Sequence, residues 1–222
     1  MVEKNRIPIK NILIAILVIP LVLAIGLYIR SFTLSDEEKF LDSVEKGDYE
    51  DVYNFVQKGV DVNAKKFNTQ TALSLATDGE VTKLLLKYGA DPNLTTSDGQ
   101  TPLMFANAEQ AELLLEHGAD IDKSDDNGWT AIMWASLTGK SDTVRVLIEN
   151  GAKIENEKEY GTSALILAAQ ASSNELLISK MLVNAGAKIS KREYSGKSAI
   201  DYAREAGKNE LVRYLEAELA KE

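Results

Sequence analysis

Thr130-Ala-Ile-Met-Trp-Ala135 is one of five copies of a short motif that decides the fold of this chain. The other copies begin at Thr71, Thr101, Ser163 and Ser198, so successive copies are 30, 29, 33 and 35 residues apart. A Ser or Thr that opens an apolar stretch is a typical helix N-cap, and the alanines of the motif allow helices to pack closely. The motif therefore predicts the start of a helix in each of five repeated units.

A second motif closes an apolar run later in each unit, and its glycine suits the positive φ of a helix C-cap. It reads glycine, then Ala or Val, then Asp or Lys, and it begins at Gly59, Gly89, Gly118, Gly151 and Gly186. Turn-forming clusters such as Thr96-Ser-Asp-Gly99 separate the units. Each unit is thus predicted to be a helix pair with a hairpin-like connection. One pair cannot bury its apolar face alone, so neighbouring pairs must stack into a solenoid.

Period, motifs and turn placement together resemble the ankyrin repeat, whose units begin with Thr-Pro-Leu-His-x-Ala and close with Gly-Ala-Asp. The resemblance covers residues 35–222 and implies an all-α ankyrin-repeat solenoid, made of helix pairs with hairpin-like turns. We expect an N-terminal cap unit, four fuller units and a C-terminal cap unit, at residues 35–66, 67–96, 97–125, 126–158, 159–193 and 194–222.

The chain departs from the ankyrin pattern in two ways. The histidine near the helix start is replaced throughout, by Ser74, Met104, Met133, Ile166 and Asp201, so its usual hydrogen bonds must be made differently or not at all. The units that start at Thr71 and Thr101 are also three or four residues short between their helices. We expect this shortfall to clip the connection between the two helices.

Residues 12–29 form the clearest change in composition, with no charge and 13 Ile, Leu or Val among 18 residues. A helix of this length spans roughly 27 Å, which nearly matches the hydrocarbon core of a bilayer. The sequence predicts one transmembrane helix here, after a basic segment (1–11) and before a short linker (30–34). A cleaved signal peptide is the alternative, because Ala24-Ile25-Gly26 resembles a cleavage site. The apolar run is longer than a typical signal peptide, which favours an uncleaved signal anchor.

The orientation of this anchor follows from the flanking charges. Lys4, Arg6 and Lys10 precede the span, whereas Arg30 alone follows it closely, so the N-terminus is expected in the cytoplasm. The ankyrin domain of this single-pass protein would then lie on the outer side, periplasmic or extracellular. The acidic residues 36–38 agree with this orientation, since an anionic cytoplasmic leaflet would repel them.

Charge and composition exclude several classes of function. Residues 31–222 carry 21 basic and 33 acidic residues, net −12, which does not suit a nucleic-acid partner because phosphates need a concentrated basic face. An acidic surface instead suits a protein partner with a basic surface. The chain has no Cys, so disulfides, thiolate metal sites and thiol catalysis are excluded.

The sequence offers no constellation for catalysis, a metal or a cofactor. The one histidine, His117, stands where ankyrin repeats often carry histidine and has no apparent catalytic partner. The stretch Ser195-Gly-Lys-Ser198 lacks the first glycine of a phosphate loop, which would fall at Lys191. In a calcium loop centred on Gly128, the first and last ligand positions would be Lys123 and Trp134. We therefore expect a protein that is not an enzyme.

The better functional signal lies at the predicted hairpin tips. Four aromatic residues stand within five residues before a Thr or Ser start, in loops expected to be exposed: Phe67, Trp129, Tyr160 and Tyr194. Leu137 and Thr138 would extend this surface from the connection between helices. The resemblance implies that tips and inner helices receive a protein partner, and Trp and Tyr are enriched at binding hot spots. The alternative is that a tip aromatic packs on the neighbouring hairpin and stiffens the stack.

These features predict a membrane-anchored module for protein–protein interaction. One role is an adaptor or assembly factor of a membrane complex. The alternative is an immunity or inhibitor protein that neutralises a toxin at the membrane, whose basic target an acidic surface would suit.

Overall fold

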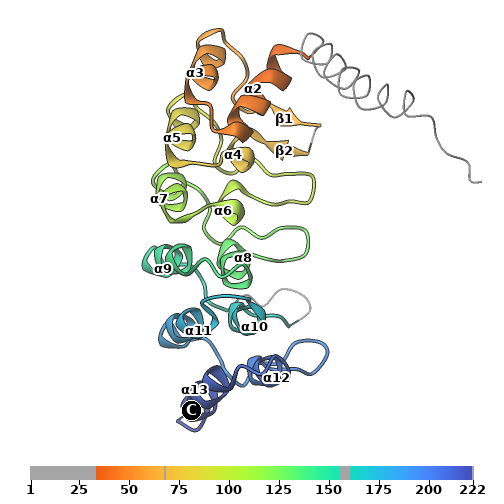
Figure 1. Ribbon diagram of the computed structural model, residues 1–222, viewed down its shortest axis with the longest axis vertical. Helices are drawn as coiled ribbons and strands as arrows, with labels where there is room; N and C mark the ends of the chain where they lie inside the picture. Colours follow the sequence, from red (N-terminus) through yellow and green to blue (C-terminus); the bar gives the residue numbers. More distant parts are fainter. Residues whose placement is uncertain (1–33, 68, 156–160, 222) are drawn as a thin grey trace, which may run out of the picture.

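The computed structural model describes residues 34–67, 69–155 and 161–221, and these form one column of stacked helix pairs (Figure 1). The inner helices lie along the middle of the column, the outer helices cover one side, and the hairpins project from the other. The pairs are α2 (Asp36–Lys46) with α3 (Tyr49–Gln57), α4 (Ala72–Leu75) with α5 (Gly79–Lys87), α6 (Pro102–Phe105) with α7 (Ala108–Glu116), α8 (Ala131–Leu137) with α9 (Ser141–Glu149), α10 (Ala164–Gln170) with α11 (Glu175–Asn184), and α12 (Ala199–Glu205) with α13 (Asn209–Leu219).

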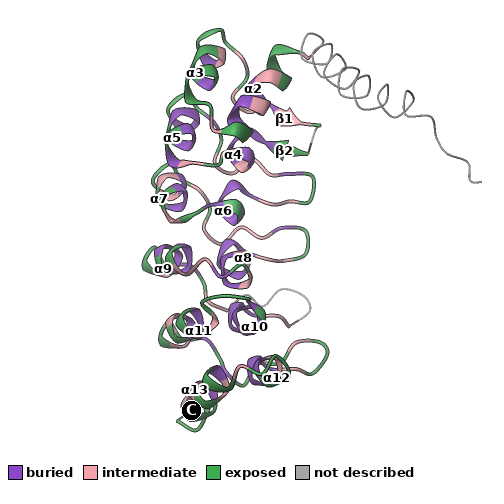
Figure 2. Cartoon of the chain, in the orientation of Figure 1, coloured by how far each residue is buried: buried purple, intermediate pink, exposed green. Residues whose placement is uncertain are grey.

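The all-α solenoid that the repeat predicted is therefore confirmed, with one small addition. The first hairpin carries two short antiparallel strands, β1 (Lys65–Lys66) and β2 (Gln70–Thr71), in which Lys65 pairs with Thr71 and Lys66 with Gln70. The buried residues lie where successive pairs face one another (Figure 2). The third residue of the repeated motif is buried in all five copies, as Leu73, Leu103, Ile132, Leu165 and Ile200.

The glycine that follows each of the first five outer helices has the expected left-handed backbone. Its φ is +84° at Gly59 and +88° at Gly89, and it stays near these values at Gly118, Gly151 and Gly186. The next residue donates its N–H back into the helix, as Ala90 N does to Leu85 O at 3.0 Å. A residue with a Cβ would be strained at this φ, so the glycines fix where each outer helix stops.

The shortfall predicted for the second and third units lies in the helices, not in the connections. Helices α4 and α6 are four residues long, whereas α8, α10 and α12 are seven. The connections to the outer helices keep similar lengths throughout. The prediction of clipped connections was therefore wrong, because an inner helix can lose its last turn while the loop must still reverse the chain.

Polar side chains hold each pair to the one before it. In four outer helices, a side chain at the N-cap or in the first turn donates to a backbone carbonyl of the preceding unit. The acceptor lies near the end of the inner helix of that unit. The bonds are Gln110 Nε2 to Ala76 O (2.9 Å), Lys140 Nζ to Phe105 O (2.6 Å), Asn174 Nδ2 to Gly139 O (2.8 Å) and Lys208 Nζ to Ala169 O (2.9 Å). These donors satisfy carbonyls that a helix end leaves without an intrahelical partner. Burial lowers the pKa of Lys140, whose ammonium is half-buried in this position.

A second series of hydrogen bonds joins neighbouring hairpins. The closing motif of each unit ends in Asp or Lys, and the residue two positions further on has a side-chain oxygen that accepts a hydrogen bond. The donor is the backbone N–H of the Asp or Lys that ends the closing motif of the next unit. The pairs are Asn63 with Asp91 (2.8 Å), Asn93 with Asp120 (2.8 Å), Asp122 with Lys153 (2.9 Å) and Glu155 with Lys188 (3.0 Å). The hairpins are therefore held in a fixed row, which sets the spacing of their tips.

The threonine that opens the repeated motif has a hydrogen-bonded hydroxyl in one unit and an unpaired one in two others, within the described part of the chain. Thr71 Oγ1 accepts the N–H of Ser74 at 3.1 Å and so caps α4. Thr101 Oγ1 and Thr130 Oγ1 are buried and make no hydrogen bond, and the histidine position beside them holds Met104 and Met133. At the histidine position, the Ser74 hydroxyl donates to Thr71 O at 2.8 Å, whereas Met104 and Met133 carry no side-chain nitrogen or oxygen that could bond the nearby threonine.

This difference predicts opposite effects for the same substitution. Thr101→Val keeps the side-chain shape and removes an unpaired buried hydroxyl, so it should raise the free energy of unfolding by about 1 kcal/mol. Thr71→Val removes a real helix cap and should lower it by about 1 kcal/mol. Urea unfolding followed by circular dichroism measures both. A Thr101→Val variant that is destabilised as much as Thr71→Val would contradict the assignment of the unpaired hydroxyl.

Candidate functional site

The candidate binding surface consists of the hairpin tips and the exposed parts of the inner helices, which we call the tip-and-helix surface. Among the described residues, three aromatic side chains are exposed on it. Phe67 on the first hairpin is 72% exposed, Tyr194 on the last hairpin is 92% exposed, and Phe105 at the end of α6 is 39% exposed. Exposed aromatics of this size are candidates for contact with a partner, because burial against another protein stabilises them more than water does.

Phe67 is held at the β1–β2 turn in a left-handed backbone conformation, with φ of +51°. Thr69 closes the turn, since its N–H and its hydroxyl both donate to Lys66 O, at 3.0 and 2.9 Å. A left-handed residue with a side chain costs roughly 1–2 kcal/mol, and later hairpins avoid this by placing glycines such as Gly99 and Gly128 at their turns. The first hairpin therefore keeps an exposed aromatic at a strained position, which is a typical feature of functional sites.

Trp129 lies half-buried against the core and is held by a buried carboxylate. Asp125 Oδ1 accepts the backbone N–H of Trp129 at 2.9 Å, and Asp125 Oδ2 accepts Nε1–H of Trp134 at 3.2 Å. The two indole rings lie 5.1 Å apart between centroids and are tilted by 55°. Trp129 and Trp134 thus form a rigid aromatic corner where the third hairpin meets α8.

Tyr194 stands on a turn that Glu193 fixes to two neighbouring elements. One carboxylate oxygen of Glu193 accepts the hydroxyls of Ser195 (2.7 Å) and Tyr202, and the other accepts the hydroxyl of Thr162 at 3.2 Å. Burial acts to raise the pKa of Glu193, but these three hydrogen bonds and the charge of Lys197 outweigh it and lower the pKa below its ordinary value. Glu193 therefore holds the last hairpin in place while Tyr194 projects into solvent.

The remaining residues predicted for the site occupy different positions. Leu137 is half-buried against the core at the end of α8, and the neighbouring Thr138 is exposed, with its hydroxyl donating to Trp134 O at 2.8 Å. Tyr160 lies outside the described residues. Phe67 and Tyr194 are the most exposed of the predicted residues that the structure describes, and they stand on the first and last hairpins of the row.

Sequence reasoning missed a row of aromatics on the inner helices. Phe105, Trp134 and Tyr202 all occupy the fifth position of the repeated motif, where Leu75 and Leu167 are buried instead. Phe105 is exposed, and Trp134 and Tyr202 are half-buried. The signal was present in the alignment of the five copies, because a position that alternates between Leu and large aromatics within one chain is not serving the core alone.

Acidic side chains are exposed at the tips of the second and third hairpins. Asp98 and Asp126 are exposed on neighbouring hairpins, which a hydrogen bond from Asp126 N to Asp98 O joins at 3.1 Å. His117 ends α7, with Nδ1 lying 2.8 Å from Leu113 O, and so serves the helix end. Across the described ranges, no group of His, Cys, Asp or Glu residues is arranged to hold a metal ion.

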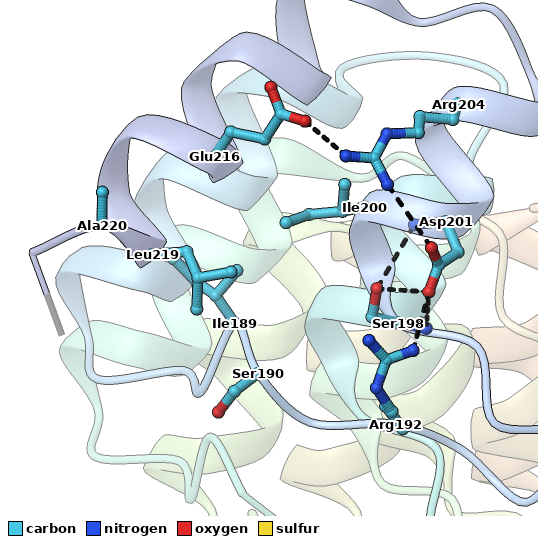
Figure 3. Close-up of a pocket in the computed structure, with 10 residues that line it drawn as sticks. All are labelled: Ile189, Ser190, Arg192, Ser198, Ile200, Asp201, Arg204, Glu216, Leu219 and Ala220. Atoms are coloured by element: carbon cyan, nitrogen blue, oxygen red, sulfur yellow. Dashed lines mark hydrogen bonds and ion pairs between the residues drawn. The ribbon is translucent and has the colours of Figure 1, made fainter.

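A pocket of about 380 Å³ lies at the C-terminal end of the column, between the last hairpin, α12 and α13 (Figure 3). Its charged groups already pair with one another: Asp201 binds Arg192 at 3.0 Å and Arg204 at 3.6 Å, and Arg204 also binds Glu216. Asp201 occupies the motif position that Met133 and Ile166 bury in inner units. The charged groups of this pocket are therefore engaged with one another, and the polar residue at this motif position is what the outer face of a capping repeat requires. It also contains Ser198, whose hydroxyl caps α12 and does not line a phosphate loop.

The described part of the chain contains no helix with the length and apolar character needed to cross a membrane. The predicted transmembrane segment, residues 12–29, lies outside the described residues.

Stacked helix pairs with projecting hairpins place the protein in the class of α-helical repeat proteins. The family model described as ankyrin repeats in three copies matches residues 40–125, 77–158 and 107–193. Because these matches cover more than half of the sequence, the chain belongs to the ankyrin-repeat family. Proteins built from ankyrin repeats generally act as interaction modules without enzymatic activity.

Three known proteins illustrate the similarity. FPV222 of fowlpox virus, named as an ankyrin repeat protein, is 36% identical over 74 residues, which are 32% of this chain and 10% of FPV222. The chain thus spans a small part of that relative. The ankyrin repeat domain of Bcl-3 is 30% identical, with a TM-score of 0.67 over 81% of this chain and 85% of that domain.

The third is a chain from the complex of the Bdellovibrio bacteriovorus predatory endopeptidase Bd0816 with the immunity protein Bd3460. It is 26% identical, with a TM-score of 0.67 over 80% of this chain and 96% of that chain.

The lowered pKa of Glu193 predicts a dependence of stability on pH. Because this pKa is lower in the folded chain, the ionised carboxylate stabilises the fold above the unfolded value of about 4.5, and the gain is lost as pH falls through the folded pKa. The free energy of unfolding, measured with urea, should therefore fall more for the wild type than for Glu193→Gln when the pH is lowered from about 6 to about 3. Two stability curves that stay parallel over this range would contradict the role given to Glu193.

Proposed function

We propose that this protein is a membrane-anchored module that binds a protein partner through its tip-and-helix surface. The observation that carries the proposal is the exposure of Phe67 and Tyr194 on the first and last hairpins and of Phe105 at the end of the inner helix α6. Phe67 and Tyr194 are four hairpins apart, and packed helices lie 8–10 Å from one another, so these anchors are separated by roughly 40 Å. A surface of this length suits a folded protein better than a small molecule.

The chemistry of the surface indicates a partner with basic patches. Asp98 and Asp126 are exposed at adjacent tips, and no ion pair neutralises either of them within the described residues. Lysines near the tips are largely engaged, since Lys66 pairs with Asp42 at 2.8 Å and Lys191 with Glu155 at 2.9 Å. Unpaired carboxylates beside aromatic anchors favour Lys or Arg on the opposing surface, which would speed association and set its register.

The anchor is supported by the composition of residues 12–29. Thirteen large aliphatic residues contribute about −6 kcal/mol at roughly −0.5 kcal/mol each on an insertion scale. The flanking charges favour a cytoplasmic N-terminus and an ankyrin domain on the outer side. The leading role is an adaptor or assembly factor of a membrane complex at that surface.

A second candidate role is inhibition of a toxin at the membrane. The observation that favours it is the similarity to a chain from the Bd0816–Bd3460 complex, which this fold covers almost completely. An acidic tip-and-helix surface would suit a basic enzyme that must be neutralised. Genes next to this one separate the two roles, because a secreted toxin gene favours the inhibitor and envelope or transport genes favour the adaptor.

Removal of the exposed anchors should abolish partner capture without unfolding the protein. Phe67→Ala, Phe105→Ala and Tyr194→Ala should each weaken binding by about 2 kcal/mol, roughly 30-fold, which is typical of hot-spot aromatics. The measurement is quantitative pull-down from detergent-solubilised membranes of the source cells, with mass spectrometry of the captured proteins. Urea unfolding of each variant checks that the fold is retained.

The matched control is Leu177→Ala, because Leu177 is 51% exposed on the outer helix α11, away from the hairpins. This variant should capture the partner as the wild type does. A partner that Leu177→Ala releases and the tip variants retain would place the interface on the outer helices instead.

The anchor is tested by the mass and the membrane behaviour of the full chain. Intact mass spectrometry of the membrane fraction should show residues 1–222 without cleavage near Ala24, and the protein should resist extraction at alkaline pH. Leu17→Arg with Leu21→Arg should release it, since each charge near the centre of a span costs about 3 kcal/mol. A mature chain that lacks residues 1–24 and is found in the soluble fraction would rule the anchor out.

A further inference from the structure

The two most exposed anchors, Phe67 and Tyr194, stand on hairpins that have a neighbouring hairpin on one side only (Figure 1). An inner hairpin is held from both sides. The second hairpin donates from Ser97 N to Thr69 O of the first at 3.1 Å, and a bond of the same length joins its Asp98 O to the third hairpin. The described part of the chain contains no hairpin before the first or after the last. The end hairpins therefore lack one of the two contacts that fix an inner one.

On the first hairpin, Lys66 supplies a contact in place of the missing neighbour. Its ammonium donates to Asp42 Oδ1 at 2.8 Å and to Glu45, and both carboxylates belong to α2. These hydrogen bonds raise the pKa of Lys66, so its ammonium stays charged at neutral pH. The carbonyl of Lys66 accepts both hydrogen bonds from Thr69 that close the turn around Phe67. Lys66 thus joins the turn that carries Phe67 to a helix of the column.

Glu193 occupies the same place on the last hairpin. Lys66 and Glu193 both stand five residues before the Thr or Ser that starts the repeated motif, and an exposed aromatic follows each of them directly. Glu193 accepts hydroxyl groups from the preceding hairpin and from α12, those of Thr162 and Tyr202. Both end hairpins therefore carry the same pair, a charged residue bound to another element and then an exposed aromatic.

The second and third hairpins use these two positions differently. Thr96 and Asp125 stand five residues before the motif and are buried. Thr96 accepts an N–H of its own turn at 3.2 Å, and Asp125 accepts N–H groups of its own turn and of Trp134. The next position holds Ser97 and Asp126, which are exposed and polar. Among the hairpin tips that the structure describes, an aromatic at this position therefore occurs only at the two ends of the row.

We propose that Lys66 and Glu193 are positioning residues that hold Phe67 and Tyr194 ready for the partner. This inference rests on the proposed function, because it gives both residues a role in binding at the tip-and-helix surface. An anchor that is already held loses less conformational freedom on binding, so more of the contact energy appears as affinity. Restraint matters most at Phe67, because its left-handed φ of +51° would relax once the ion pairs with α2 were broken.

The mobility of a spin label tests this restraint without a partner. The chain has no cysteine, so Phe67→Cys introduces a single labelling site in the full chain. Lys66→Met should speed the motion of the label several-fold in electron paramagnetic resonance, whereas Lys66→Arg, which keeps the charge and the reach, should leave it slow. A label on Asn127→Cys, at the exposed tip of the third hairpin, is the matched control and should not respond to Lys66→Met. Unchanged motion at residue 67 would overturn the positioning role.

A double-mutant cycle tests whether Lys66 acts through Phe67. The probe is the most abundant protein that the wild type captures from the detergent extract and that Phe67→Ala releases, purified and titrated against each variant. Lys66→Met should weaken its binding about 3- to 10-fold and should have no further effect in the Phe67→Ala background. Lys66→Arg should bind as the wild type does. Glu193→Ala and Tyr194→Ala form the same cycle on the last hairpin, and urea unfolding checks that each variant stays folded.

The outcomes separate this inference from the proposed function. If Phe67→Ala and Tyr194→Ala release no captured protein, the tip-and-helix surface is not the binding surface, and the positioning role fails with it. If they weaken binding while Lys66→Met and Glu193→Ala do not, the proposed function stands and the positioning role is overturned. Equal losses from Lys66→Met in the wild type and in Phe67→Ala would show that Lys66 acts independently of this anchor, which also overturns the proposal.

Discussion

The structure depends on the fact that a single helix pair of this size cannot cover its own apolar face. Each pair is therefore buried by the next, and the third motif position stays at 6% exposure or less from Leu73 to Ile200. Stacking then brings helix ends of one unit beside those of the next. That proximity is what allows Gln110 or Lys140 to reach carbonyls of the preceding unit, and Asn63 or Asn93 to accept an N–H from the following hairpin. The hydrogen bonds between units are a consequence of apolar stacking, and they fix its register.

Because the core uses only part of each unit, the rest of the unit is free to carry binding chemistry. The fifth motif position shows this freedom clearly, since Leu75 and Leu167 are buried there while Phe105 is exposed. Shortening α6 to four residues places Phe105 at a helix end. Phe67 shows the same separation in another form, because a strained exposed turn is tolerated where β1 and β2 hold both sides of it. Stability resides between units, and the candidate site lies on their edges.

The sequence predicted what depends on period and on local residue preference. Helix pairs, the left-handed glycines after the outer helices, and the hydroxyl cap at Thr71 all follow from residues close together in the chain. It failed where the outcome depends on contacts between units. The shortfall in the second and third units left the connections intact and removed the last turn of α4 and α6. Trp129 was predicted at an exposed tip, but it is half-buried, because it is bonded to Asp125 and packed against Trp134. The role of Glu193 was not predicted, because its partners Tyr202 and Thr162 lie on other elements.

In the proposed anchored form, a short tether would make the orientation of the column part of its function. A linker of six residues would confine the first helix pair to the membrane surface, and a partner in the same membrane would meet the module at a raised effective concentration. That advantage is lost if the tip-and-helix surface faces the lipid. The acidic tips would add selectivity in the proposed geometry, since a partner would have to present basic groups at the height above the bilayer at which Asp98 and Asp126 were held.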